Sequence, residues 1–219
     1  MKPGPRTPDP GPLIIGHRGF AASFPDNSLE GVEAALAAGA DGVEVDIRPC
    51  LDGTWVCQHD RSRGGRAVAG WPLDSLRREG VPTLADVVRS VATDRWLYVD
   101  IKPLAAAELR KGLPELTALL GPRLGSTRII SSAERLLTLV KDALPGVSRS
   151  LVFDTPPDPL PPGLELSPFH RLVEFFVGSG RPLHPWTVDL PTRMRELAAL
   201  GVASITTNEP VVALEVLRG

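Results

Sequence analysis

The chain has 219 residues, of which 42% are hydrophobic and 23% charged, and its formal net charge is −2. This length and composition suit one globular domain with a sizeable core, or one domain with a small insertion. The near-neutral charge and the lack of a basic run make nucleic acid a poor candidate partner, although a local cluster could hold a small ligand with one or two phosphates.

The first residues are rich in proline and glycine and lack the apolar segment of a secretory signal, so we expect residues 1–12 to form a disordered leader. No stretch of the sequence has the length and hydrophobicity of a membrane span. Cys50 and Cys57 match neither a disulfide framework nor a zinc-binding spacing, which favours reduced structural thiols. These features predict a cytoplasmic protein without an integral membrane segment.

Strand and helix patterns alternate along the rest of the chain. Short apolar runs predict eight strands, at residues 13–16, 43–48, 96–101, 127–130, 147–153, 164–166, 183–188 and 202–206. Helical spacing of apolar residues predicts helices at 29–38, 83–91, 104–120, 133–143, 169–177, 192–200 and 210–217. Asn27 or Ser28 can cap the first of these helices, and Pro114, with Gly112, should bend or split the third.

The second predicted strand is followed by a hairpin and then by an irregular stretch. Asp52-Gly53 is a turn signal, and residues 54–58 form the returning strand. Residues 61–80 combine arginines with four glycines and Trp71-Pro72, which indicates either a small insertion over the mouth of a barrel or an ordinary surface loop.

Eight strands alternating with helices predict an α/β fold in which residues 13–219 form a single TIM-type (β/α)8 barrel with a short insertion after the second strand. An open, doubly wound sheet is the competing architecture. The first strand is not followed by Gly-x-Gly-x-x-Gly, so the sequence gives no support to the dinucleotide site expected of that alternative. A barrel also explains why polar residues collect where the strands end, because such barrels place their chemistry there.

Two strands carry ionisable residues on one face. Side chains alternate along a strand, so Glu44 and Asp46 point one way while Val43, Val45 and Ile47 point the other, as they would beneath a layer of helices. Two carboxylates on a buried face repel each other and lose hydration, and a divalent metal is the simplest compensation. Taken alone, the pair could equally be a solvated charge on an edge strand.

Other charged groups fall near the same edge. Asp100 shares a strand face with Lys102, while His17 and Arg18 follow the first strand and His59 follows the returning strand of the hairpin. Arg18 and Lys102 suit phosphate, and the two imidazoles can act as acid and base near neutral pH. Two histidines on opposite sides of a phosphorus atom would suit an in-line displacement.

Several runs carry a family resemblance. His17-Arg18-Gly19, Pro25-Asp26-Asn27-Ser28, the run from Gly39 to Asp46, and His59-Asp60 resemble the glycerophosphodiester phosphodiesterase family. Asp100-Ile101-Lys102 resembles the Glu-x-Lys strand of that family, and Trp186-Thr187-Val188 resembles its late Trp-Thr-Val strand. The resemblance implies a barrel and a divalent-metal phosphodiesterase. It implies the following roles: acid/base catalysis for His17 and His59, phosphate contacts for Arg18 and Lys102, metal ligation for Glu44, Asp46 and Asp100, and an alcohol pocket lined by Trp186.

The chain departs from the family pattern at three positions. Asp100 stands where glutamate is usual, which predicts either a metal closer to the third strand or a bridging water. Asp189 stands where asparagine is common, and Asn208 where aspartate is common. The insertion at 61–80 is shorter than usual, which leaves the identity of the alcohol more open than the reaction class.

The expected activity is hydrolysis of a small-molecule glycerophosphodiester to an alcohol and glycerol 3-phosphate, with Mg²⁺ or Ca²⁺ as cofactor and Mn²⁺ as a further option. One alternative is lysophospholipase D-type hydrolysis of a lysophospholipid, for which the insertion offers only Trp71 as a large apolar group. Another is a barrel that binds a phosphate ligand without turnover.

Overall fold

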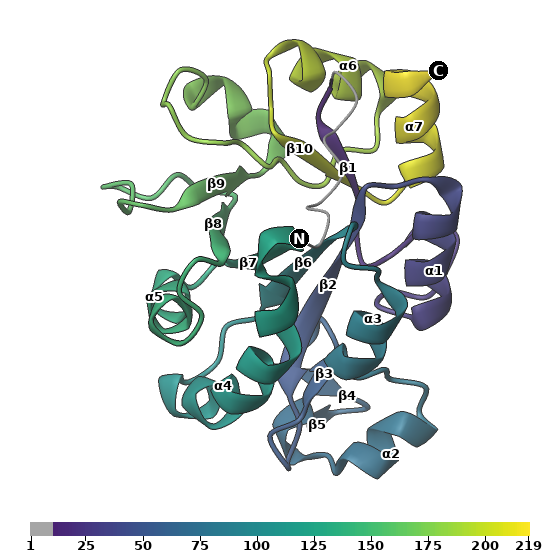
Figure 1. Cartoon of the computed structure of the whole chain (residues 1–219), viewed down its shortest axis with the longest axis vertical. Coiled ribbons are helices and arrows are strands. Elements are labelled where there is room, and N and C mark those ends of the chain that lie inside the picture. The colour runs from purple at the N-terminus through teal and green to yellow at the C-terminus, as the bar shows by residue number, and fades with distance from the viewer. Residues whose placement is uncertain (1–10) are drawn as a thin grey trace.

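A parallel sheet curls around the centre of the molecule (Figure 1). The computed structural model describes residues 11–219, so residues 1–10 of the predicted leader lie outside the described part. Neighbouring strands follow the order β10-β1-β2-β6-β7-β8-β9, and every pair along this path is parallel. In that order the strands span Ser204–Thr207, Leu13–Gly16, Gly42–Pro49, Trp96–Ile101, Thr127–Ser131, Ser148–Phe153 and Glu165–Pro168.

Residues 183–188 close the ring between β9 and β10. Leu183 and Trp186 form isolated parallel bridges with the β9 side, and the carbonyl of Pro185 accepts a 3.0 Å hydrogen bond from the backbone N–H of Thr206 in β10. Pro185 has no N–H to give to a ladder, so the seventh predicted strand is an extended segment rather than a regular strand. The TIM-type barrel expected from the sequence is confirmed.

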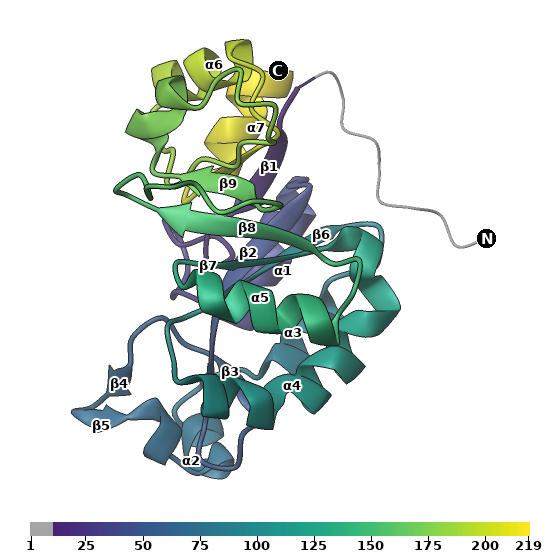
Figure 2. The same ribbon diagram turned by 90° about the vertical axis from the view of Figure 1, so that its left-hand side faces the viewer.

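Helices cover the outside of the barrel (Figures 1 and 2). The α-helices after the strands are α1 Leu29–Ala38, α3 Leu84–Ser90, α4 Ala106–Leu120, α5 Glu134–Ala143, α6 Pro191–Ala199 and α7 Pro210–Arg218. Two 3-10 segments complete this layer, η2 Gly121–Ser126 and η3 His170–Phe175. The helix predicted at 169–177 is therefore a shorter 3-10 turn.

Local signals explain where these helices begin and end. The Ser28 hydroxyl accepts a hydrogen bond from the backbone N–H of Gly31, and Gly39 ends α1 with a left-handed φ of 108°. Pro114 does not split α4, which runs unbroken from 106 to 120. Pro114 lies on the exposed side, where the carbonyl of Arg110 that loses its partner can bond to water.

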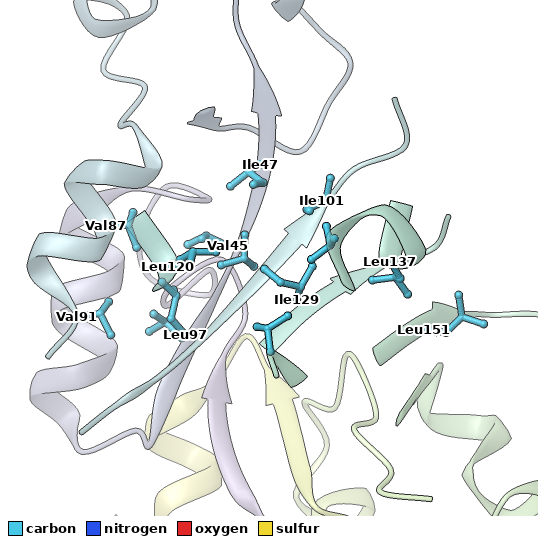
Figure 3. Packing of buried hydrophobic residues seen from close by; sticks show 14 of the residues in the cluster. Val45, Ile47, Val87, Val91, Leu97, Ile101, Leu120, Ile129, Leu137 and Leu151 are labelled. Atoms are coloured by element: carbon cyan, nitrogen blue, oxygen red, sulfur yellow. The ribbon is translucent and has the colours of Figure 1, made fainter. Parts of the chain in front are cut away.

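The main hydrophobic core lies between the strands and the helices (Figure 3). Val45 and Ile47 of β2 pack outward in this layer with Val87 of α3 and Leu120 of α4, as the alternation along β2 predicts. The opposite face of β2 is thereby turned toward the barrel interior, which is where its two carboxylates lie.

The insertion after β2 is more regular than its sequence indicates. The hairpin strand β3, Trp55–Cys57, runs antiparallel to β2 and is followed by β4 Ser62–Arg63, β5 Arg66–Ala67, η1 Val68–Gly70 and α2 Leu73–Arg78. Val56, Val68, Leu76 and Val81 form a small core of its own. Figures 1 and 2 show this lobe at the end of the molecule opposite α6 and α7.

Candidate active site

A cavity of about 460 Å³ lies at the carboxyl ends of the strands. Seven of the eight predicted site residues line it: His17, Arg18, Glu44, His59, Asp100, Lys102 and Trp186. The eighth, Asp46, lies behind the wall in contact with Arg18 and Lys102. None of the residues 61–80 lines this cavity.

Three buried carboxylates converge at the edge of the cavity. Glu44, Asp46 and Asp100 are at most 6% exposed, and one oxygen from each lies within 4.8 Å of the others. The short side chain of Asp100 therefore still reaches the other two. Its Oδ1 atom is buried without a hydrogen-bond partner, which a buried carboxylate oxygen rarely is. An all-oxygen donor set with a free ligand atom fits a hard divalent cation.

Cationic and amide groups compensate the negative charge of Asp46 more fully than that of the other two carboxylates. The Nζ atom of Lys102 lies 2.7 Å from Asp46 Oδ1 and 2.8 Å from Asp100 Oδ2, and Arg18 Nε lies 3.1 Å from Asp46 Oδ2. The side-chain amide of Asn27 also donates to Asp46 Oδ2 at 2.9 Å. Burial alone would raise the pKa of Asp46, but Lys102 and Asn27 outweigh it and hold that pKa below its usual value.

The negative charge of Glu44 is compensated less fully than that of Asp46. Burial raises its pKa well above the usual value, and the like charges of Asp46 and Asp100 raise it further. The pKa of Asp100 is also raised by burial, although Lys102 opposes this. Two of the three carboxylates thus favour either a proton or an additional cation at this edge.

The turn after β1 brings Arg18 over the carboxylates. Arg18 has a left-handed φ of 50°, and its backbone N–H donates to Glu44 Oε2 at 3.0 Å. Its guanidinium contacts Asp26 as well as Asp46. Gly19 packs so tightly that an added Cβ would lie 2.7 Å from the backbone of Gly31, so no larger residue fits there. The Arg18 guanidinium is therefore pre-positioned before any ligand arrives.

His17 belongs to a chain of hydrogen bonds that fixes its protonated nitrogen. Its Nδ1 lies 2.7 Å from Asn208 Oδ1, and Asn208 Nδ2 donates to Asp189 Oδ2 at 2.8 Å. The Asp189 carboxylate can only accept, so the amide NH₂ of Asn208 faces it and the amide oxygen faces His17. His17 therefore carries its proton on Nδ1, and the lone pair of Nε2 points toward the acidic edge, 3.9 Å from Glu44.

The surroundings of His17 keep its imidazole neutral. Burial lowers its pKa from 6.5, the positive charge of Arg18 lowers it further, and the hydrogen bond that its Nδ1–H donates to Asn208 opposes these effects only in part. A neutral imidazole with a fixed Nδ1–H is ready to accept a proton at Nε2.

His59 reaches the cavity from the end of the hairpin and is more open to water. Its side chain is 42% exposed, and Nδ1 lies 2.9 Å from Asp60 Oδ1. The backbone N–H of Gln58 donates to the carbonyl of Asp46 at 3.0 Å, and Arg48 Nε donates to the carbonyl of His59 at 2.9 Å. These bonds attach the imidazole to β2 and hence to the carboxylates.

The far wall of the cavity is largely apolar. Ile130, Val152 and Phe153 line it together with Trp186, whose Nε1 donates to the carbonyl of Ser167 at 2.8 Å. Because that N–H is already bonded, Trp186 offers the cavity its ring rather than a donor.

Several side chains joined by hydrogen bonds form the floor of the cavity. Arg128 donates to the hydroxyl of Tyr98 and to Glu165, which is 2.8 Å from His184 Nε2, while His184 Nδ1 is 2.8 Å from Ser204 Oγ. Burial lowers the pKa of His184 to about 4, so this histidine is neutral. His184 lies two residues before Trp186, and in an extended segment this spacing puts both side chains on one face.

Comparison with known proteins agrees with this fold. The model of the glycerophosphoryl diester phosphodiesterase family matches residues 17–121. The glycerophosphodiester phosphodiesterase of Caldanaerobacter subterraneus subsp. tengcongensis is 27% identical over an alignment covering 94% of this chain and 98% of that protein. A probable glycerophosphodiester phosphodiesterase 1 of Mycobacterium tuberculosis is 42% identical over 30% of this chain and 26% of its own length.

Solved structures share the architecture. The putative glycerophosphoryl diester phosphodiesterase of Silicibacter pomeroyi DSS-3 superposes with a TM-score of 0.82 at 21% identity, covering 95% of this chain and 94% of its own. An Oleispira antarctica phosphodiesterase, solved with its product sn-glycerol-3-phosphate, gives 0.80 at 17% identity, covering 94% and 96% of the two chains. At these identities the likeness supports the fold.

The barrel and its matching relatives place the protein among the phosphoric diester hydrolases. Within that class the chain is similar to the glycerophosphoryl diester phosphodiesterase family, and the resemblance seen in its sequence is confirmed. Among residues 11–219, no helix is long and apolar enough to span a membrane.

Proposed function

We propose that the protein hydrolyses glycerophosphodiesters to an alcohol and glycerol 3-phosphate in a divalent-metal-dependent, in-line reaction that uses His17 and His59. The observation that carries this proposal is the unpartnered oxygen of Asp100 among three buried carboxylates, in the same cavity as two imidazoles. Glu44, Asp46 and Asp100 would hold the cation, and a bound Mg²⁺, Ca²⁺ or Mn²⁺ would neutralise phosphate charge in this site.

His17 is the base in this scheme. Its Nε2 lone pair takes a proton from the attacking water, and the imidazolium that forms keeps its second proton on Nδ1, in the bond to Asn208. Asn208 cannot rotate away because Asp189 holds its amide NH₂. The hydrogen bonds thus keep the base in one tautomer and one orientation through the reaction.

His59 is the acid. The carboxylate of Asp60 accepts from Nδ1, which leaves the Nε2 proton free to pass to the departing alkoxide. Its greater exposure suits a group that must recover a proton from solvent after each turnover. The two histidines therefore differ in environment in the way that their two roles require.

Arg18 and Lys102 would contact the phosphate oxygens. Both are already held against Asp46, so little side-chain entropy is lost when a phosphate binds. The organic group of the diester would lie along Ile130, Val152 and the ring of Trp186.

An alcohol-release assay tests the proposal directly. Glycerophosphocholine, glycerophosphoethanolamine and glycerophosphoglycerol should each release alcohol with added metal and not after chelation. Full activity in chelator, with no metal in the purified protein, would contradict the metal requirement. Failure to cleave any diester would instead favour a barrel that binds phosphate without turnover.

A lysophospholipid is the second candidate substrate, and the apolar wall of the cavity favours it. Including lysophosphatidylcholine in the same assay separates the two substrate classes, because only the second requires a place for an acyl chain.

A further inference from the structure

A second cavity, of about 400 Å³, lies between the insertion and the start of α4. Three arginines line it, Arg48 from β2, Arg61 from the start of the insertion and Arg135 from α5. The wall contains one carboxylate, Glu108, whose Oε2 accepts a 2.8 Å hydrogen bond from the backbone N–H of Ala105. The charge facing this cavity is therefore net positive.

The three guanidinium groups retain unused donors. Arg48 donates to the backbone carbonyls of His59 and Pro103, at 2.9 and 3.3 Å, and Arg135 donates to that of Leu104 at 2.9 Å. Within residues 11–219, none of the three forms an ion pair with a carboxylate. Because each guanidinium has five N–H donors, most of this capacity is left for a ligand.

Two short stretches of chain connect this cavity to the candidate active site. His59 lines the active-site cavity, Asp60 follows it, and Arg61 lines the second cavity. Lys102 and Pro103 make the same connection from β6. The two cavities are thus neighbours across the acid residue and one of the phosphate-binding residues.

We propose that this arginine-lined cavity binds a second anionic group, a phosphate or carboxylate, carried by the alcohol part of the diester. The inference rests on the proposed function, because it extends the same substrate into a neighbouring cavity. Arginine forks match the planar oxygens of these groups and form strong charge-assisted hydrogen bonds with them. The site therefore selects diesters whose alcohol carries extra negative charge.

A matched pair of substrates tests this selection. Glycerophosphoglycerol ends in a neutral glycerol, whereas bis(glycerophospho)glycerol carries a further phosphate on that glycerol. We expect kcat/KM for the first cleavage of the doubly phosphorylated compound to be higher by about tenfold or more. In the double variant Arg61→Gln/Arg135→Gln this preference should fall to about twofold, because bis(glycerophospho)glycerol has two cleavable diester groups where glycerophosphoglycerol has one. Turnover of glycerophosphoglycerol should be unchanged in this variant.

Arg195→Gln is the control, because Arg195 is an exposed arginine of α6, which carries none of the residues that line the second cavity. It should keep the full preference. Equal preference in wild type and the double variant, or no preference in wild type, would overturn the inference.

If the wild-type protein cleaves neither compound, that result counts against the proposed function and leaves the second cavity to be tested separately. Titration calorimetry with bis(glycerophospho)glycerol then decides about the cavity. Weaker binding to the double variant than to wild type supports the inference, and equal binding, or no binding to wild type, refutes it.

Discussion

Asn208 binds Asp189 at two points, since its backbone and side-chain nitrogens donate to the two carboxylate oxygens at 2.8 Å each. The sequence shows both residues as departures from the family pattern, in opposite senses. Because they contact each other, the two departures form one exchange in which the bond is kept and the amide and carboxylate trade places. His17 consequently faces a neutral amide oxygen.

This arrangement predicts the pH profile. His17 must be neutral to accept a proton, so activity falls as the pH drops through its pKa, which lies below 6.5. Reversing the exchange in Asp189→Asn/Asn208→Asp puts a carboxylate beside Nδ1 and should raise that pKa. We expect the acid limb of kcat/KM to move upward by about one pH unit. An unchanged limb in a variant with wild-type Tm would show that His17 is not the base.

Asn208→Ala tests the orienting role without adding charge. It removes the acceptor of the His17 Nδ1–H, so the ring can rotate and change tautomer. We expect kcat to fall by about 10–100-fold, the range typical of groups that orient a functional side chain. The matched control is Asn208→Gln together with the Tm of both variants, which separates loss of orientation from unfolding.

His17→Ala and His59→Ala should each lower kcat by about 10²–10⁴-fold while the circular dichroism spectrum is retained. The two losses should be strongly non-additive in the double variant, because both groups serve one displacement. Near-normal turnover in either single variant would remove that residue from the mechanism.

Measuring metal affinity tests whether Asp100 is a metal ligand. Asp100→Asn removes one charged ligand while keeping the shape of the side chain, so titration with Mg²⁺, Mn²⁺ or Ca²⁺ should show affinity lower by about tenfold or more. Asp100→Glu serves as the charge-conserving partner. Because the Asp100 oxygen already converges with Glu44 and Asp46, the longer side chain should give no tighter binding. Equal affinity in wild type and Asp100→Asn would leave Asp100 only as the partner of Lys102.

A stability prediction concerns the contact between α4 and the hairpin. A Cβ on Gly112 would lie 2.7 Å from ring atoms of Trp55, whose Nε1 donates to the Gly112 carbonyl at 2.9 Å. Gly112→Ala should therefore cost about 1–3 kcal/mol and lower the Tm by about 2–4 °C per kcal/mol. Gly125→Ala is the control, since Gly125 of η2 has no left-handed φ and nothing lies within 4 Å of an added Cβ. It should leave the Tm unchanged or slightly higher.

Alternation and strand order were sufficient to predict much of the site. Glu44 and Asp46 could be placed inside the barrel because Val45 and Ile47 are apolar, and the carboxyl ends of parallel strands meet at one edge. Asp100 and Lys102 follow from the same reasoning on β6. These are local patterns, and each rests on residues one or two positions apart.

Contacts between distant segments could not be predicted in this way. His17 and Asn208 are 191 residues apart, and no local pattern relates the amide to the imidazole. The floor formed by Arg128, Tyr98 and His184 likewise depends on how three separate segments pack. The regular elements of the insertion could not be predicted for a further reason, since they are only two to six residues long and give little periodicity.

The same long separation matters while the chain is being synthesised. β1 pairs with β10 in a parallel register from Leu13–Ser204 to Gly16–Thr207, so the first strand emerges from the ribosome nearly the whole length of the chain before its partner. At a synthesis rate of about 5–20 residues per second, Asn208 is added roughly 10–40 seconds after His17. A nascent chain that does not yet include Asn208 therefore presents His17 without the acceptor that orients its imidazole.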